Sequence, residues 1–204
     1  MVSGVRSRMF DERALIRLCR HGDQRSFEQL VALKRDKAIR VAFNIVGDED
    51  DAKDVAQQAF IKLWGVIRGY DETMRFDPWF FKIVVNLAID QYRRTQRRSV
   101  TLAGPAALES AESHPEAGLS APGADVPLMR HELRGIFNRL AAGLGPVQRA
   151  VFTLKEIEGA ETEEIASILG IRESTVRNHL MQARRILKEG LRRWYPEYAK
   201  DFNR

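Results

Sequence analysis

Residues 161–191 carry polar and basic side chains at spacings that suit hydrogen bonding to DNA. On a helix of 3.6 residues per turn, one face of residues 173–187 is apolar through Val176, Leu180, Ala183 and Leu187. The remaining surface carries Arg177, Asn178, Met181, Gln182, Arg184 and Arg185. Such groups can hydrogen-bond base edges and neutralise phosphates in a major groove. The pattern predicts a DNA-recognition helix, although a solvated basic helix packed on its neighbour would have a similar composition.

The preceding segment predicts the scaffold that presents these residues. Ile165, Ala166 and Leu169 form an apolar stripe on a shorter helix. Gly170 follows, and glycine tolerates the positive φ that often ends a helix. Residues 172–193 contain seven lysines and arginines and two glutamates, so this segment has a net charge of +5. The bend at Gly170, the apolar stripes and the positive charge together indicate a helix-turn-helix that inserts into a DNA groove.

The overall composition is that of a soluble globular protein and points to no catalytic chemistry. The 204 residues are 44% hydrophobic and 30% charged, with a net charge of +5. The single Cys19 and four scattered histidines lack the spacing of metal ligands, so we expect no disulfide, no metal and no cofactor. Cys19 itself suits a buried small hydrophobic position. The apolar runs are too short to span a bilayer and no signal-peptide core is present, so we expect a cytoplasmic protein.

A segment rich in proline and alanine separates two helical regions. Residues 105–127 contain four prolines, two glycines and four acidic residues, and no lysine or arginine. Such a segment cannot bury enough apolar surface to offset its conformational entropy, so it predicts a flexible acidic linker. It could lie transiently on a basic groove, but a solvated spacer is an equally good interpretation. The expected fold is all-α, with two small helical domains joined by a flexible linker and a helix-turn-helix in the second.

Before the linker we expect helices at about 11–21, 24–46, 50–68 and 77–98. The third begins with a run of carboxylates, which the positive end of a helix stabilises. Its polar face is formed by Asp51, Asp54, Gln57 and Gln58. A purely structural helix could show the same pattern.

The fourth expected helix combines aromatic and basic residues. It begins at Asp77 and Pro78, a capping residue followed by a proline whose missing N–H costs nothing there. Arginines follow the aromatic residues at its C-terminal end, and this combination suits single-stranded nucleic acid, where bases stack and phosphates need cations. For Phe80 and Phe81, burial in the core is the better interpretation.

Two blocks, DEDDAKDVAQQAFIKLW…FDPWFFKIVVNLAIDQYRR and TEEIASILGIRESTVRNHLMQARRIL, resemble bacterial sigma factors of the extracytoplasmic-function group. Many repressors share a helix-turn-helix, so the upstream block makes the resemblance specific. It implies that residues 10–98 are the family's second region, which binds core RNA polymerase and the −10 promoter element. Residues 99–128 are then the linker, and residues 129–196 are the fourth region, which reads the −35 element.

Matching positions imply three sets of contact residues. The polymerase-binding set is Asp51, Asp54, Gln57, Gln58, Phe60, Leu63 and Trp64. The −10 set is Trp79, Asn86, Asp90, Arg93 and Arg94, beside a loop at 69–76 that offers a pocket for an unstacked base. The −35 set is Arg172, Thr175, Arg177, Asn178, Met181, Gln182, Arg184 and Arg185.

Two of these positions depart from the usual family pattern. Gln58 stands where the family usually has glutamate, which removes one charge from the polymerase contact. Gln182 stands where arginine is common, and because glutamine favours adenine while arginine favours guanine, we expect an altered −35 preference. For Trp79, packing against its own helix is the favoured interpretation.

The resemblance implies a promoter-specificity subunit that binds core RNA polymerase, recognises duplex −35 and single-stranded −10 DNA, and helps to open the promoter. It also implies an anti-sigma factor that clamps the two domains. Such a protein is not an enzyme, and the sequence shows no nucleophile-base pair or phosphate-cradling loop. Two alternatives stay open: a regulator that binds operators without polymerase, and a decoy that only sequesters an anti-sigma factor.

Overall fold

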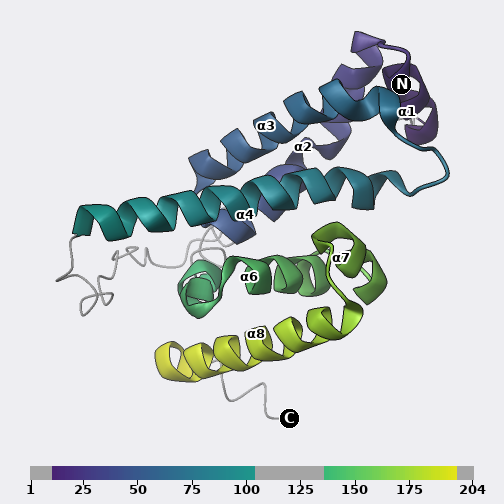
Figure 1. Cartoon of the computed structure of the whole chain (residues 1–204). Coiled ribbons are helices and arrows are strands. Elements are labelled where there is room, and N and C mark those ends of the chain that lie inside the picture. The colour runs from purple at the N-terminus through teal and green to yellow at the C-terminus, as the bar shows by residue number, and fades with distance from the viewer. Residues whose placement is uncertain (1–10, 104–135, 197–204) are drawn as a thin grey trace, which may run out of the picture.

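The computed structural model describes residues 11–103 and 136–196, and these ranges contain helices and turns but no strand (Figure 1). The first range, here the N-terminal module, forms α1 (Glu12–Arg20), α2 (Gln24–Val46), α3 (Glu49–Val66), the short turn η1 (Ile67–Gly69) and α4 (Phe76–Ala103). The second range, the C-terminal module, forms η3 (Ala141–Gly143), α6 (Pro146–Phe152), the π-helical turn η4 (Thr153–Ile157), α7 (Thr162–Leu169) and α8 (Glu173–Trp194). The prediction of an all-α fold is confirmed.

Aspartates fix where the first three helices begin. The carboxylate of Asp11 accepts a hydrogen bond from Arg13 N at 3.1 Å, and that of Asp23 accepts one from Ser26 N at 2.6 Å. Asp48 caps α3 by accepting from two backbone N–H groups of its first turn. These bonds satisfy donors that the first turn of a helix leaves without partners.

The beginning and the end of α4 differ from the sequence expectation. The helix begins at Phe76, so Asp77 lies in its first turn, and the Asp77 carboxylate accepts a hydrogen bond from Lys34 Nζ at 2.6 Å. The helix continues to Ala103, through residues expected to start the linker. The rest of the expected linker, 104–128, lies outside the described residues.

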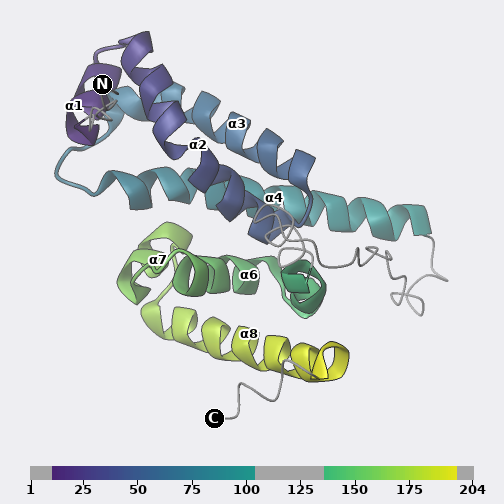
Figure 2. The same cartoon turned by 180° about the vertical axis from the view of Figure 1, so that it is seen from behind.

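In the N-terminal module, α2, α3 and α4 pack along one another (Figures 1 and 2). Leu30, Leu63 and Phe80 have no exposed surface, and each comes from a different helix of this group. Phe81 is also buried, so the interpretation of Phe80 and Phe81 as core residues is confirmed. Burial of large apolar side chains on three helices supplies the main driving force for this arrangement.

The C-terminal module contains the predicted helix-turn-helix. Helix α7 ends at Gly170, whose φ of 66° places it in the left-handed region, and α8 begins three residues later. Val176 and Ala183 of α8 are buried, while Leu180 and Leu187 pack on the core with part of their surface exposed. The apolar stripe predicted for this helix is therefore confirmed.

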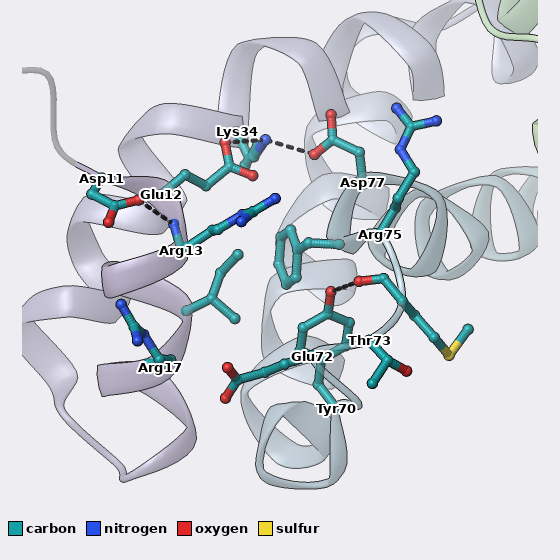
Figure 3. Close-up of a pocket in the computed structure, with 13 residues that line it drawn as sticks. Asp11, Glu12, Arg13, Arg17, Lys34, Tyr70, Glu72, Thr73, Arg75 and Asp77 are labelled. Atoms are coloured by element: carbon teal, nitrogen blue, oxygen red, sulfur yellow. Dashed lines mark hydrogen bonds and ion pairs between the residues drawn. The ribbon is translucent and has the colours of Figure 1, made fainter.

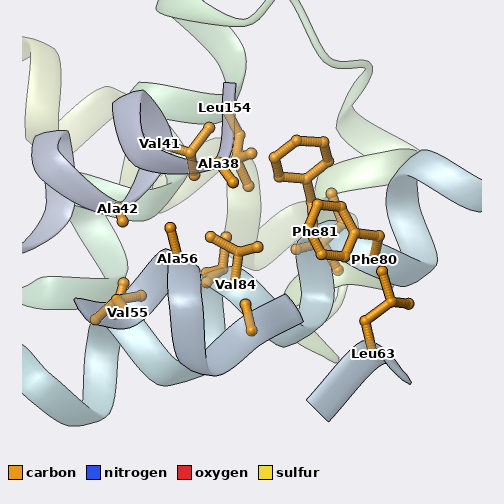
Figure 4. Packing of buried hydrophobic residues seen from close by; sticks show 14 of the residues in the cluster. Ala38, Val41, Ala42, Val55, Ala56, Leu63, Phe80, Phe81, Val84 and Leu154 are labelled. Atoms are coloured by element: carbon orange, nitrogen blue, oxygen red, sulfur yellow. The ribbon is translucent and has the colours of Figure 1, made fainter. Parts of the chain in front are cut away.

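The two modules pack against each other and share one hydrophobic core. Leu154 and Ile165 of the C-terminal module belong to the same buried cluster as Val41 and Phe81 of the N-terminal module (Figure 4). Helix α7 contacts α4, and α6 contacts both α2 and α4. The sequence indicated two domains, but it gave no sign that they pack together.

Polar contacts border this shared core. Arg40 donates from Nε and Nη2 to the carboxylate of Glu158, at 2.8 and 3.3 Å, and this carboxylate raises the pKa of Arg40. Arg149 is buried, and burial lowers its pKa. Its guanidinium donates to the carbonyls of Ala141 at 3.0 Å and Ile45 at 3.3 Å, so it joins the two modules through backbone groups.

Candidate nucleic-acid interface

Helix α8 presents the predicted base-facing residues on the outer side of the C-terminal module. Figures 1 and 2 place α8 beyond α6 and α7 from the viewpoint of α4. Of the eight predicted residues, Thr175 is half-buried and the other seven are exposed: Arg172, Arg177, Asn178, Met181, Gln182, Arg184 and Arg185. Met181 is 64% exposed, so its side chain is open to contact with a partner.

Several of these side chains already have partners within the protein. Arg184 Nη2 lies 2.6 Å from Glu156 Oε1 of η4, and Arg177 Nη1 lies 3.1 Å from Glu173 Oε2 within α8. Gln182 accepts a hydrogen bond from Gln148 of α6 at 2.8 Å. Exposed ion pairs are weak, so phosphates can replace the carboxylates as arginine partners on DNA binding.

Helix α4 carries a second polar stripe. Asn86, Asp90, Arg93 and Arg94 are all exposed, and their spacing of three or four residues places them on one side of the helix. Lys82, which the sequence reasoning did not select, is exposed one turn before Asn86 and extends this stripe. These side chains can meet the bases and phosphates of an extended strand.

Trp79 packs within an aromatic group at the start of α4. Its ring centroid lies 4.8 Å from that of Tyr70 and 6.0 Å from that of Phe76, and the side chain is half-buried. It is absent from the lining of the cavity beside it. This contact supports the packing interpretation of Trp79 and leaves only part of its ring for nucleic acid.

A cavity of about 730 Å³ lies beside the loop that precedes α4 (Figure 3). Tyr70 and residues 72–77 form one wall, with Met74 52% exposed, and Arg13 and Arg17 of α1 lie opposite. The Tyr70 hydroxyl donates to the Met74 carbonyl and so fixes the loop. The sequence pointed to this loop but not to the α1 wall, because only the fold brings α1 next to it.

Lys34 of α2 connects the elements around the cavity. Its Nζ lies 2.8 Å from Glu12 Oε2 of α1 and 2.6 Å from Asp77 Oδ1 of α4 (Figure 3). Burial favours a lower pKa for Lys34, but the hydrogen bonds and charges of Asp77 and Glu12 outweigh it and raise the pKa. Lys34 therefore stays charged and holds α1, α2 and the first turn of α4 together.

The predicted polymerase-binding helix, α3, divides into exposed and buried residues. Asp54, Gln57, Gln58 and Trp64 are exposed, whereas Phe60 is 7% exposed and Leu63 is fully buried. We therefore assign Leu63 to the core that supports the helix, whereas Phe60, although mostly buried, also lines an apolar groove between α2 and α3. Asp51 is half-buried, and its carboxylate accepts a hydrogen bond from Gln91 Nε2 of α4 at 2.7 Å.

An apolar groove of about 700 Å³ runs between α2 and α3. Phe27, Val31 and Ile39 line it from α2, and Ile61 and Trp64 line it from α3. The rings of Phe27 and Trp64 lie 4.6 Å apart, and Ile61 is 66% exposed. The sequence reasoning missed the α2 side, although the four-residue spacing of Phe27 and Val31 was a visible signal.

The described residues contain no group of three or more His, Cys, Asp or Glu side chains able to hold a metal ion. No helix among them is long and apolar enough to cross a membrane.

Comparisons with known proteins agree with this arrangement. The family described as "Sigma-70 region 2" matches residues 30–98, and the family "Sigma-70, region 4" matches residues 134–187. The "ECF RNA polymerase sigma-E factor" of Escherichia coli (strain K12) is 30% identical over 182 residues, covering 87% of this chain and 93% of that protein. The "ECF RNA polymerase sigma factor SigW" of Bacillus subtilis is 27% identical over 177 residues, covering 87% and 95%.

Solved structures share the fold. "CnrH in complex with the cytosolic domain of CnrY" superposes with a TM-score of 0.64 at 24% identity, covering 88% of this chain and 96% of that one. "The sigma factor RpoE in complex with the anti-sigma factor NepR from Bartonella quintana" gives 0.58 at 23% identity, covering 81% and 96%.

Proposed function

Because the chain belongs to the sigma-70 family and is similar to sigma factors of the extracytoplasmic-function group, we propose that it is a promoter-specificity subunit of bacterial RNA polymerase. It directs the enzyme to −35 and −10 elements and assists promoter melting. Sigma factors are initiation subunits without an active site of their own, so the chain is not an enzyme. The observation that carries this proposal is that one chain combines the exposed helix α8, the polar stripe of α4 with the cavity near its start, and the apolar groove between α2 and α3.

The groove between α2 and α3 suits core polymerase. Ile61 and Trp64 offer apolar surface that water does not favour, and Asp54, Gln57 and Gln58 are exposed polar and acidic residues of the same helix. A partner surface with apolar anchors and basic residues would be complementary to this site. Asp51 contributes chiefly by holding Gln91 of α4.

The α4 stripe and the adjacent cavity suit the −10 element. Lys82, Arg93 and Arg94 can neutralise the phosphates of one strand, and Asn86 can hydrogen-bond a base. Turning a base out of the duplex costs a few kcal/mol, roughly, so melting requires a place that receives the base. The cavity walled by Tyr70, residues 72–77 and α1 lies beside the start of α4 and supplies that place.

Helix α8 suits the −35 element in duplex form. Arg177, Asn178, Met181 and Gln182 are exposed and would meet base edges, and Arg172, Thr175 and Arg184 would contact phosphates. The turn at Gly170 sets the angle between α7 and α8.

An anti-sigma factor is the expected inhibitor. The RpoE structure that shares this fold is a complex with an anti-sigma factor, and the shared core of the present chain gives a closed form that such a partner can hold. The site of action is the cytoplasm, where RNA polymerase transcribes DNA.

Run-off transcription with purified core polymerase tests the proposal. We expect a promoter-dependent product with the intact chain and a loss of at least tenfold with Ile61→Glu, because a charge in the groove must be desolvated on docking. Leu33→Glu is the matched control, since Leu33 is 52% exposed on α2 and does not line the groove. Tight operator binding without polymerase, or equal activity of both variants, would contradict the proposal.

A further inference from the structure

Arg75 belongs to the wall of the cavity beside α4 and also contacts the C-terminal module. It lies in the loop that precedes α4 and lines the cavity. Its side chain extends past Asp77, away from the α1 wall (Figure 3). The Nη1 group donates to Glu164 Oε2 of α7 at 3.3 Å. A residue of the proposed base-receiving cavity is therefore paired with the other module.

The two partners of this ion pair differ in how firmly the protein holds them. The side chain of Glu164 is 17% exposed, and that of Arg75 is 76% exposed. Glu164 lies in the first turn of α7, where the positive end of the helix stabilises its carboxylate. Arg75 extends from a loop into water, so its guanidinium can turn to another anion. A pair with one partner so exposed is weak, and a phosphate can replace the carboxylate.

The cavity beside α4 and the interface between the modules share one wall. A second cavity, of about 170 Å³, lies at this interface. Arg75 and Asp77 line it from the N-terminal module, and Glu158 and Glu164 line it from the C-terminal module. Arg75 and Asp77 also line the larger cavity. Separation of the modules would remove Glu164 and leave the guanidinium of Arg75 at the edge of the larger cavity.

Arg75 is well placed to meet the backbone of a strand whose base enters this cavity. It lies one residue before α4, whose polar stripe is the proposed path of the strand. Lys34, in contrast, is mostly buried and paired with two carboxylates. Arg13 and Arg17 lie on the opposite wall. Arginine binds phosphate and carboxylate groups with the same planar set of N–H donors.

We propose that Arg75 binds a phosphate of the −10 strand at the edge of the cavity, and that Glu164 takes the place of this phosphate in the packed form. This inference rests on the proposed function. Glu164 then competes with DNA for one cation, so packing of the modules weakens −10 binding at this residue. Binding of the strand, in turn, favours separation of the modules.

The two partners of the pair should respond to substitution in opposite directions. If the ion pair only held the modules together, loss of either side chain would loosen the packing in the same way. If Arg75 is shared, Glu164→Gln frees it for DNA, whereas Arg75→Gln removes the DNA contact itself. Glu163→Gln is the matched control, because Glu163 lies in the same first turn of α7, is exposed, and loses the same charge.

Fluorescence anisotropy of a labelled single strand tests the proposal with the free full-length chain. The strand carries the −10 sequence of a promoter that the holoenzyme uses in run-off transcription. We expect Glu164→Gln to strengthen binding about two- to fivefold, and Glu163→Gln to leave it unchanged. Arg75→Gln should weaken binding by about fivefold or more. The double variant should bind like Arg75→Gln alone, and thermal melting should show equal folding of all variants.

The same measurement on the holoenzyme separates competition from direct contact. We expect the modules to be apart there, so Glu164 no longer reaches Arg75. Glu164→Gln should then have no effect, whereas Arg75→Gln should still weaken strand binding and should lower the run-off product.

Four results would overturn the inference. The first two are a change of the same sign for Arg75→Gln and Glu164→Gln, and equal effects of Glu163→Gln and Glu164→Gln. The others are a gain from Glu164→Gln that persists when Arg75 is replaced, and wild-type strand binding by Arg75→Gln in the holoenzyme. Failure of the proposed function looks different, because the wild-type holoenzyme would then give no run-off product from any promoter.

Discussion

Lys34 shows at the residue scale how one buried charge can organise the walls of a cavity. Its ammonium group contacts carboxylates from α1 and α4 while the side chain is 9% exposed. Removal of this cation leaves the carboxylates of Glu12 and Asp77 without their ion-pair partner. Because both carboxylates are partly exposed, hydration offsets part of the lost interaction energy.

We therefore expect Lys34→Met to lower the free energy of unfolding by about 1–2 kcal/mol and to weaken binding of the single-stranded −10 element. Urea unfolding and strand binding measure the two effects. Lys53→Met is the control, because Lys53 pairs with Glu49 on the exposed surface of α3, and we expect it to leave both measurements unchanged. The raised pKa of Lys34 also means that its contribution is complete below pH 10.5 and is lost as the pH rises through the folded-state value.

Cys19 is expected to be chemically inert in the folded chain. Burial, and then the charge of Asp23, raise the pKa of its thiol from 9.0 to about 11. Because the thiolate is the reactive form, alkylation by iodoacetamide should be slow at pH 8 and should increase as the pH approaches 11. In urea the rate should follow a pKa near 9.0. Fast labelling of the folded chain at pH 8, measured by mass spectrometry, would contradict this prediction.

Single residues also show where sequence reasoning stops. The exposure of Asp54 and Gln57 could be predicted, because helical periodicity separates polar from apolar faces. The burial of Leu63 and the exposure of Ile61 could not, since both are large apolar residues on one helix. Their difference depends on where α2 and α4 pack, and that information is absent from local spacing.

At the scale of elements, the turn between α7 and α8 depends on a glycine. Gly170 has a φ of +66°, and a Cβ there would meet no atom within 4 Å, so a substitution is penalised by the backbone alone. We expect Gly170→Ala to lower the free energy of unfolding by about 1 kcal/mol and to weaken −35 binding.

Gly65 provides the opposite case, because it lies within α3 with open space around it. Gly65→Ala should raise the free energy of unfolding by about 0.5–1 kcal/mol. Thermal or urea unfolding compares the two variants. A change of the same sign in both would contradict the conformational explanation.

The helices themselves were largely predictable, for physical reasons. Carboxylates at Asp48 and Asp23 mark helix starts, and Gly47 and Gly170 mark helix ends, so local chemistry places these boundaries. The continuation of α4 to Ala103 was not predictable, because residues 99–103 lack an apolar period of their own.

At the scale of the whole molecule, we expect the two modules to separate when the protein binds a promoter. Elements named −35 and −10 are roughly 25 base pairs apart, or about 85 Å of duplex at 3.4 Å per base pair. Helix α4, with 28 residues, is about 42 Å long. If each module contacts one element, two modules packed side by side cannot reach both, so we expect the packed form described here to be a resting form.

The ion pair between Arg40 and Glu158 tests this view, because Glu158 is only 7% exposed. Arg40→Glu places two like charges together and should shift the balance toward the open form by roughly tenfold or more. Small-angle scattering should show a larger radius of gyration. Arg40→Glu combined with Glu158→Arg restores the pair and should restore the compact form, and an unchanged radius in the single variant would count against the prediction.

The packing between modules was beyond the reach of the sequence. Leu154 and Phe81 face each other's module, but in the sequence each resembles an ordinary core residue of its own helix. The acidic, proline-rich linker predicted two domains that move independently. A linker sequence carries no information on the affinity between the domains that it joins.

Because the two modules share a core, their packing against each other competes with the binding of a partner that requires them apart. The apparent dissociation constant of such a partner therefore depends on the fraction of molecules in which the two modules are separated. A chain closed in about 99 molecules of 100 would bind about a hundredfold more weakly than its parted form. A substitution in the shared core, at Leu154 for example, would weaken the packing between the modules. It would thereby strengthen binding to a target that Leu154 does not contact.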